Sequence, residues 1–95
     1  MRAYEAMYII NPELDEEQSN AIVEKFQGIV TGTGGELVKL DKWGKRKLAY
    51  EIDHKREGFY VLMQFNGEPA TAQELDRVFR ITDGIMKYMI VKEDK

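Results

Sequence analysis

The sequence predicts an α+β fold in which a four-stranded antiparallel sheet carries two helices on one face. Two observations lead to this class. Four segments rich in β-branched and aromatic residues alternate with two segments whose apolar residues recur at helical spacing. Their order is strand, helix, strand, strand, helix, strand, which right-handed crossovers turn into a ferredoxin-like split βαβ unit. Residues 1–95 are expected to form one domain around one core.

The first strand is expected over residues 2–10, because this segment is rich in aromatic and β-branched residues and stops at an Asn-Pro turn signal. A helix is expected to begin after Asp15. The two acids that follow favour the positive end of a helix, and Gln18 completes a capping box. Apolar residues then recur at i, i+4, i+7 and i+8, namely Ile22, Phe26, Ile29 and Val30. The helix is expected to end in the glycine-rich segment 32–35.

The second and third strands are expected over residues 36–52 and 58–66, paired as a hairpin around a polar turn at 54–57. In the first of these strands, Gly44 indicates a bulge or bend. Beyond it, apolar and aromatic residues alternate with other types at Leu48, Tyr50 and Ile52. The hairpin is therefore predicted to be long and to change direction along its length.

A second helix is predicted from Thr71 and Glu74, which repeat the capping-box spacing. Its apolar stripe is Leu75, Val78 and Phe79. The helix is expected to stop at Asp83-Gly84, and residues 85–92 form the last strand.

One face of this sheet is left without helices, and strand parity predicts which residues it carries. Glu5, Gln64 and Lys87 are polar residues in mid-strand and are expected to point away from the helices. The same parity places six apolar side chains on the open face: Met7, Ile9, Tyr60, Leu62, Met89 and Val91. Two interpretations stay open. Either these residues meet a protein partner, since monomers rarely expose a large apolar patch, or a loop covers them or a strand is shifted by one residue.

The net charge of −3 argues against nucleic-acid binding until its distribution along the chain is considered. Residues 39–56 carry seven Lys or Arg against three acids, a net charge of +4. The remaining residues carry seven basic and fourteen acidic side chains, a net charge of −7. Cations are thus concentrated in one extended segment of an otherwise acidic chain.

Several classes of function are excluded. Without cysteine there is no disulfide, thiolate metal site or cysteine nucleophile. His54 is the only histidine and lies in a predicted turn, so neither a zinc site nor a Ser-His-Asp triad has its other members. The segment 32–35 follows a helix, whereas a dinucleotide loop opens one. No signal peptide or membrane span is visible. We expect a cytoplasmic protein that is not an enzyme, with no metal, cofactor, membrane or small-molecule substrate.

The most informative segment is Lys42-Trp43-Gly44-Lys45-Arg46-Lys47. Its cations flank an aromatic residue, a combination that RNA contact favours, because cations bind phosphates and an aromatic ring stacks on an exposed base. A solvated basic edge strand that resists edge-to-edge pairing has a similar composition. Trp43 is equally a candidate for covering the core beside the hairpin. Composition alone leaves these interpretations open.

A longer motif adds a family resemblance. Gly44, Arg46, Leu48, Ala49, Tyr50 and Ile52 reproduce the Gly-x-basic-x-Leu-Ala-Tyr-x-Ile motif of the bacterial small-subunit ribosomal protein S-six family. The opening Met1-Arg2-x-Tyr4-Glu5 and the closing Ile90-Val91-Lys92 are also similar to that family, so the resemblance spans the chain. It implies a ferredoxin-like ribosomal protein that binds the central domain of 16S ribosomal RNA together with the small-subunit protein S-eighteen. Two departures stand at Glu51, where many members have proline, and after Lys95, where some have a longer acidic tail.

On this resemblance, phosphate contacts are expected from cations, with Trp43 as the candidate for stacking. The expected RNA-binding residues are Arg2, Lys42, Trp43, Lys45, Arg46, Lys47, Arg80, Lys87 and Lys92. Arg77 and Arg80 lie on the second helix, where solvated charge is the simpler interpretation. One alternative is a single-stranded RNA module of the RRM type, whose third-strand motif resembles residues 58–61, although residues 62–64 depart from it. Another is a regulatory domain without RNA that self-associates through the apolar face.

Overall fold

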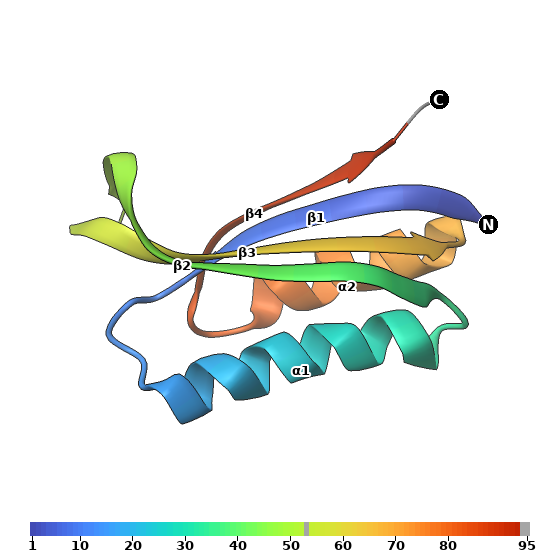
Figure 1. Cartoon of the computed structure of the whole chain (residues 1–95), viewed down its shortest axis with the longest axis horizontal. Coiled ribbons are helices and arrows are strands. Elements are labelled where there is room, and N and C mark those ends of the chain that lie inside the picture. Colours follow the sequence, from blue (N-terminus) through green and yellow to red (C-terminus); the bar gives the residue numbers. More distant parts are fainter. Residues whose placement is uncertain (53, 94–95) are drawn as a thin grey trace.

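A computed structural model describes residues 1–52 and 54–93 and confirms the predicted α+β class and order of elements (Figure 1). The strands β2, β3, β1 and β4 lie in that order in one antiparallel sheet, and both helices cover the same face of it. The elements are β1 (Arg2–Ile10), α1 (Glu16–Gly32), β2 (Glu36–Ile52), β3 (Lys55–Gly67), α2 (Pro69–Ile81) and β4 (Ile85–Lys92). Positions 53, 94 and 95 lie outside the described residues, and so does the expected departure from the family after Lys95.

The core lies between the sheet and the helices, and period-two alternation in the strands builds it. From β1 and β3 it takes every second residue: Tyr4, Ala6, Tyr8, Ile10, Val61, Met63 and Phe65. From the helices it takes Val23, Phe26, Val30, Leu75, Val78 and Phe79. Tyr8, Phe26 and Phe79 are in mutual ring contact at its centre, with centroids 4.0–5.4 Å apart. This layer fixes which strand positions remain for the open face.

Helix α1 begins as the capping box predicts. The Asp15 Oδ1 accepts a hydrogen bond from the Gln18 backbone N–H at 2.7 Å, and the Gln18 Oε1 accepts one from the Asp15 N–H at 3.2 Å. Of the predicted stripe, Phe26 and Val30 are fully buried. Val23, which the stripe omits, is also buried. The buried face is therefore wider than the four residues that periodicity selects.

The predicted start of α2 is wrong. The helix begins at Pro69, after Glu68, and Thr71 does not cap it. Proline fits the first turn because its missing N–H has no helical partner there, so the helix starts earlier than the Thr71–Glu74 spacing suggests. Thr71 is instead fully buried, and its Oγ1 lies 2.8 Å from the Thr33 Oγ1. The third strand also starts three residues early, at Lys55, which shortens the predicted polar turn.

Tyr8 provides a stability test of the core. Its hydroxyl is buried without a hydrogen-bond partner in the described part of the chain, and burial raises the pKa of this phenol. An unpartnered buried hydroxyl is destabilising, so Tyr8→Phe is expected to raise the free energy of unfolding by about 1 kcal/mol while the ring contacts remain. Urea unfolding would measure it.

Tyr88→Phe is the matched control for that variant. The Tyr88 hydroxyl donates to the Asp76 Oδ1 at 2.8 Å, so its removal is expected to change stability in the opposite direction. Destabilisation by both variants would mean that the Tyr8 hydroxyl has a partner, such as a buried water.

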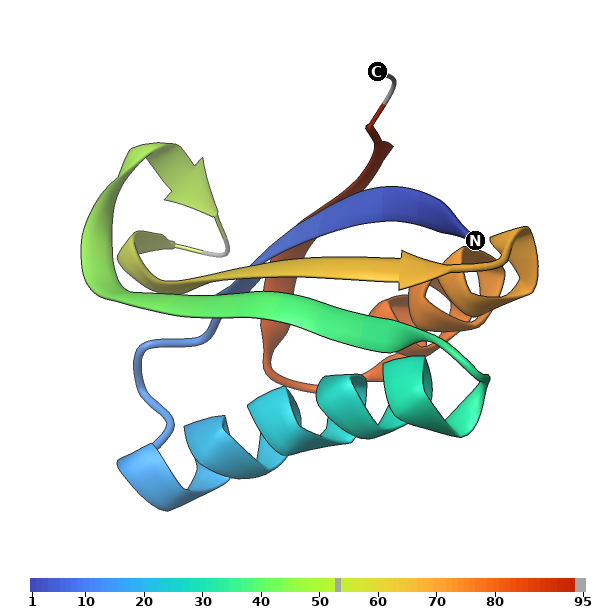
Figure 2. The same cartoon turned by 45° about the vertical axis from the view of Figure 1, so that its right-hand side comes forward.

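The far end of the β2–β3 hairpin bends out of the sheet. We call residues 44–52 and 54–58 the arm. Gly44 has φ +80°, and the β2–β3 register shifts between Lys42 and Gly44, which confirms the predicted bulge. From there the arm curls over the face of the sheet opposite the helices (Figures 1 and 2). A basic segment that would be the edge of a flat sheet thus projects from the open face.

Candidate nucleic-acid interface

The open face has the composition that strand parity predicts. Its residues lie in three rows across β3, β1 and β4: Gln64–Glu5–Val91, Leu62–Met7–Met89 and Tyr60–Ile9–Lys87. Met89 and Val91 are exposed, at 56% and 44%, while Met7, Tyr60 and Leu62 are half-buried. At these positions β1, β3 and β4 keep the predicted phase, and four of the six apolar side chains form a surface beside the arm.

Ile9 differs from its neighbours because the arm covers it. Its side chain is only 7% exposed, although it belongs to the open face. A Cβ placed at Gly58 would collide with the Ile9 Cγ2 and would lie 3.4 Å from the Leu48 Cδ2. The interpretation that chain folds over the patch is therefore correct at Ile9. Glycine at position 58 allows the approach.

A contact between the two outermost strands holds the arm in this position. The Lys87 Nζ on β4 donates a hydrogen bond to the Tyr50 hydroxyl on β2 at 2.6 Å and lies 5.2 Å from the ring centroid. Because β3 and β1 separate β2 from β4, the two residues meet only by the arm crossing the sheet. The hydrogen bond from Lys87 to the Tyr50 hydroxyl raises the pKa of the ammonium. Lys87, expected to bind RNA, thus has a role in positioning the arm.

This contact predicts that the order of the arm depends on Tyr50. Tyr50→Ala removes both the hydrogen bond and the cation–π contact, so arm amides are expected to exchange with deuterium faster, while those of β1 and α1 are unchanged. Tyr50→Phe keeps the ring and is expected to give an intermediate rate. Hydrogen-exchange mass spectrometry resolves these segments. Equal protection of the arm in all three proteins would show that the contact does not hold it.

Apart from Lys87, the predicted RNA-binding residues are divided among three places. Trp43, Arg46 and Lys47 line a cavity of about 500 Å³ with Tyr60, on the open face at the base of the arm. Lys42 and Lys45 instead line a groove against the start of α1, where the Lys42 Nζ donates to the Asn20 Oδ1 at 3.0 Å. The bulge causes this division, because it places Lys42 opposite Val61, which faces the helices, and Gly44 opposite Tyr60, which does not.

The third group lies at the other end of the sheet. Lys92 and Arg80 line a groove between α2 and β4, and Arg2 pairs with Gly67 at the end of β3. Lys47 pairs with Glu57 near the start of β3, ten residues from Gly67. At about 3.3 Å per strand residue the two ends are separated by about 33 Å of strand. The nine predicted residues therefore do not form one continuous site.

Internal ion pairs separate the cations further. Several basic side chains form ion pairs with acidic ones. These pairs are Lys39–Asp41, Lys55–Glu13, Arg56–Glu51, Arg77–Glu74 and Arg80–Asp76. Hydrogen bonds from Arg80 and then Tyr88 lower the pKa of Asp76, which keeps that carboxylate charged. Among residues 1–52 and 54–93, eight basic side chains form no ion pair. Lys25, Lys42 and Lys87 donate hydrogen bonds to neutral oxygens. The other five have no such partner either and are called uncompensated here: Arg2, Lys45, Arg46, Lys47 and Lys92. Three of these five uncompensated cations are consecutive residues of the arm.

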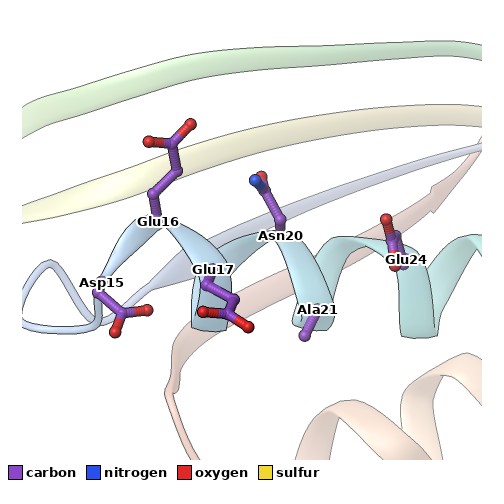
Figure 3. A pocket seen from close by; sticks show the side chains of 6 residues that line it. All are labelled: Asp15, Glu16, Glu17, Asn20, Ala21 and Glu24. Atoms are coloured by element: carbon purple, nitrogen blue, oxygen red, sulfur yellow. The ribbon is translucent and has the colours of Figure 1, made fainter.

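Another cavity lies on the opposite layer and is acidic. It measures about 680 Å³ and is lined by α1 residues, namely Asp15, Glu16, Glu17, Asn20, Ala21 and Glu24. Figure 3 shows Glu16 and Asn20 directed toward the strands and Glu17 directed away, so these side chains do not converge on one point. No cluster of three metal-binding side chains occurs in the described residues. In the same part of the chain, no helix could span a membrane.

Comparison with known proteins gives full-length similarity. A family model described as ribosomal protein S6 matches residues 3–92. The small ribosomal subunit protein bS6 of Desulforudis audaxviator is 56% identical over 94 residues, covering 99% of this chain and 100% of that protein. The bS6 protein of Desulforamulus reducens is 58% identical over 93 residues, covering 98% of each. The crystal structure of 30S ribosomal protein S6 from Thermotoga maritima superposes with a TM-score of 0.92 at 33% identity, covering 97% of this chain and 87% of that one.

Proposed function

Because the chain belongs to the ribosomal protein S6 family, we propose that it is a structural component of the small ribosomal subunit and binds ribosomal RNA there. The family is one of ribosomal structural proteins and not of enzymes. The full-length match favours this role over a single-stranded RNA module of the RRM type or a self-associating regulatory domain. In finer terms, the proposed ligand is the central domain of 16S ribosomal RNA, bound together with protein S-eighteen.

The observation that carries this proposal is the set of uncompensated cations on the arm. Lys45, Arg46 and Lys47 are all exposed, and the described residues offer them no acidic partner within ion-pair distance. A cation without an internal partner is available to a phosphate, whereas a paired one must first lose its acid. The RNA is therefore proposed to contact this projecting segment first.

The distribution of acids supports one orientation on the RNA. Acidic side chains line the cavity on α1, in the layer away from the open face. A polyanion is repelled by that layer and attracted by the arm, so the long-range field turns the open face toward RNA even though the net charge is negative. The overall charge of the chain is thus compatible with RNA binding.

The open apolar face supports a protein partner beside the RNA. Met7, Leu62, Met89 and Val91 form a continuous surface, on strands next to the arm. A protein that covers these residues would lie next to the RNA-binding cations and could touch the same RNA. We assign this surface, with Tyr60 and Ile9 at its edge, to S-eighteen, and joint binding is expected to be tighter than binding by either protein alone.

A binding assay with and without the partner tests the proposal. A fragment of the 16S central domain is titrated with this chain, with S-eighteen, and with both proteins, at several salt concentrations. Weak binding by the chain alone and tighter, salt-sensitive binding with the partner are expected. A stable homodimer in sedimentation, with no RNA affinity under either condition, would instead support the self-associating alternative.

A further inference from the structure

Trp43 and Tyr60 form an aromatic pair at the base of the arm. At the bulge Gly44 pairs with Tyr60, and Trp43 is the extra residue that precedes it. The indole stacks on the Tyr60 ring and therefore lies on the open face. The two ring centroids lie 6.4 Å apart with an interplanar angle of 10°. Trp43 is 42% exposed and Tyr60 is half-buried, so Trp43 does not cover the helix-facing core. The pair presents aromatic surface to solvent, with its two rings nearly parallel.

Two uncompensated cations border this pair. Arg46 and Lys47 line the same cavity of about 500 Å³ as the two rings, and neither forms an ion pair in the described residues. The volume is within the range of about 300–1,000 Å³ found for ligand sites. Aromatic faces bind the π surface of a base, and guanidinium and ammonium groups bind its phosphate. The four side chains together match the parts of one nucleotide.

The chemistry of the cavity favours an unpaired base over the alternatives. A base inside a duplex has both faces covered by its neighbours, so a duplex can offer only phosphates here. An apolar protein segment packed on the rings would desolvate Arg46 and Lys47 without supplying them with an anion, which is unfavourable. The rings do not by themselves distinguish one base from another, so stacking of this kind tolerates any sequence.

We propose that Trp43 and Tyr60, flanked by Arg46 and Lys47, bind one unpaired nucleotide of the RNA, with its base stacked on the aromatic pair and its phosphate on the two cations. This inference rests on the proposed function and deepens it, because it names the kind of nucleotide that the arm contacts. It also gives Tyr60 a role beside RNA and not only beside a protein.

The chain provides its own probe for this site, because Trp43 is its only tryptophan. The full chain is titrated with a single-stranded oligonucleotide and with a duplex containing the same sequence, at one low salt concentration, while tryptophan fluorescence and binding are followed together. Stacking is expected to quench Trp43 to saturation with the single strand. The duplex is expected to bind through phosphates with much less quenching.

Variants separate stacking from charge. Trp43→Ala is expected to weaken single-strand binding by about 5- to 150-fold, which is the effect of losing one base–aromatic stacking contact. Duplex binding is expected to change little. Trp43→Phe keeps an aromatic face and is expected to retain most of the affinity. Ile81→Ala is the matched control, since Ile81 is equally an exposed apolar side chain, at 65%, but lies on α2. Thermal unfolding of each variant verifies that the fold is retained.

Three results would overturn the inference. They are salt-dependent RNA binding without quenching, an equal decrease of single-strand and duplex affinity in Trp43→Ala, and quenching by S-eighteen in the absence of RNA to which the single strand adds nothing. The last would assign the aromatic pair to the protein interface. In each of these cases RNA binding persists and the proposed function stands, whereas absence of any RNA binding, alone or with the partner, would remove both.

Discussion

Replacing Lys45, Arg46 and Lys47 together with alanine is expected to lower the slope of log affinity against log salt by about three units, one for each phosphate that is no longer neutralised. The physical reason is counterion release. Each cation that meets a phosphate frees a condensed ion from the RNA, and these three side chains form no ion pair in the described residues. Affinity at low salt is expected to fall steeply, and filter binding at four or more salt concentrations gives the slope.

A matched variant separates the effect of ion pairing from the number of charges. Alanine at Lys39, Arg56 and Arg77 removes the same three charges, but from side chains already paired with Asp41, Glu51 and Glu74. This control is expected to leave the slope nearly unchanged. Similar slopes in the two triple variants would mean that net charge, and not the unpaired cations at 45–47, governs RNA binding.

The second large effect is expected at the partner surface. Leu62 lies in the middle row of the open face, between Asp41 and Met7. In Leu62→Asp a carboxylate would be buried without a counter-charge when the partner covers this face, which costs about 3–5 kcal/mol, or more than a hundredfold in affinity. The free chain is expected to remain folded, because Leu62 lies on the open face and is only half-buried. Calorimetric titration with S-eighteen measures the decrease in affinity.

The neighbouring residue is the control for this substitution. Met63 follows Leu62 in β3 but faces the helices and is fully buried, so Met63→Asp is expected to unfold the chain. Leu62→Lys carries the opposite charge. If burial of a charge is decisive, and not its sign, this variant should lower the affinity for the partner as much as Leu62→Asp does. Unfolding of Leu62→Asp, or unchanged partner affinity in both Leu62 variants, would remove this face from the interface.

The features that the sequence predicted correctly are local ones. The capping box at Asp15 involves residues three apart, and the exposure of Met89 follows from alternation in a single strand. The start of α2 is also a local feature, but its prediction was wrong. Two local signals compete there, and the helix begins at Pro69 and not at Thr71.

The shape of the candidate site depends on contacts that local patterns do not contain. Gly44 indicated a bulge but not the direction of the bend, which is set where Tyr50 meets Lys87, 37 residues away along the chain. The bulge also changes the phase of β2, so the basic segment divides between two faces of the sheet. The sequence placed Tyr60 only in the apolar patch. Its ring stacks on Trp43 because of that change of phase. Neither result could be read from composition or spacing.

The most direct test of the central claim is a density map of a small ribosomal subunit assembled with this chain. The account predicts that the arm lies against RNA, with Arg46 and Lys47 at hydrogen-bonding distance from phosphate oxygens and the α1 acids turned away. A map in which residues 45–47 project into solvent, with no phosphate near them, would contradict it.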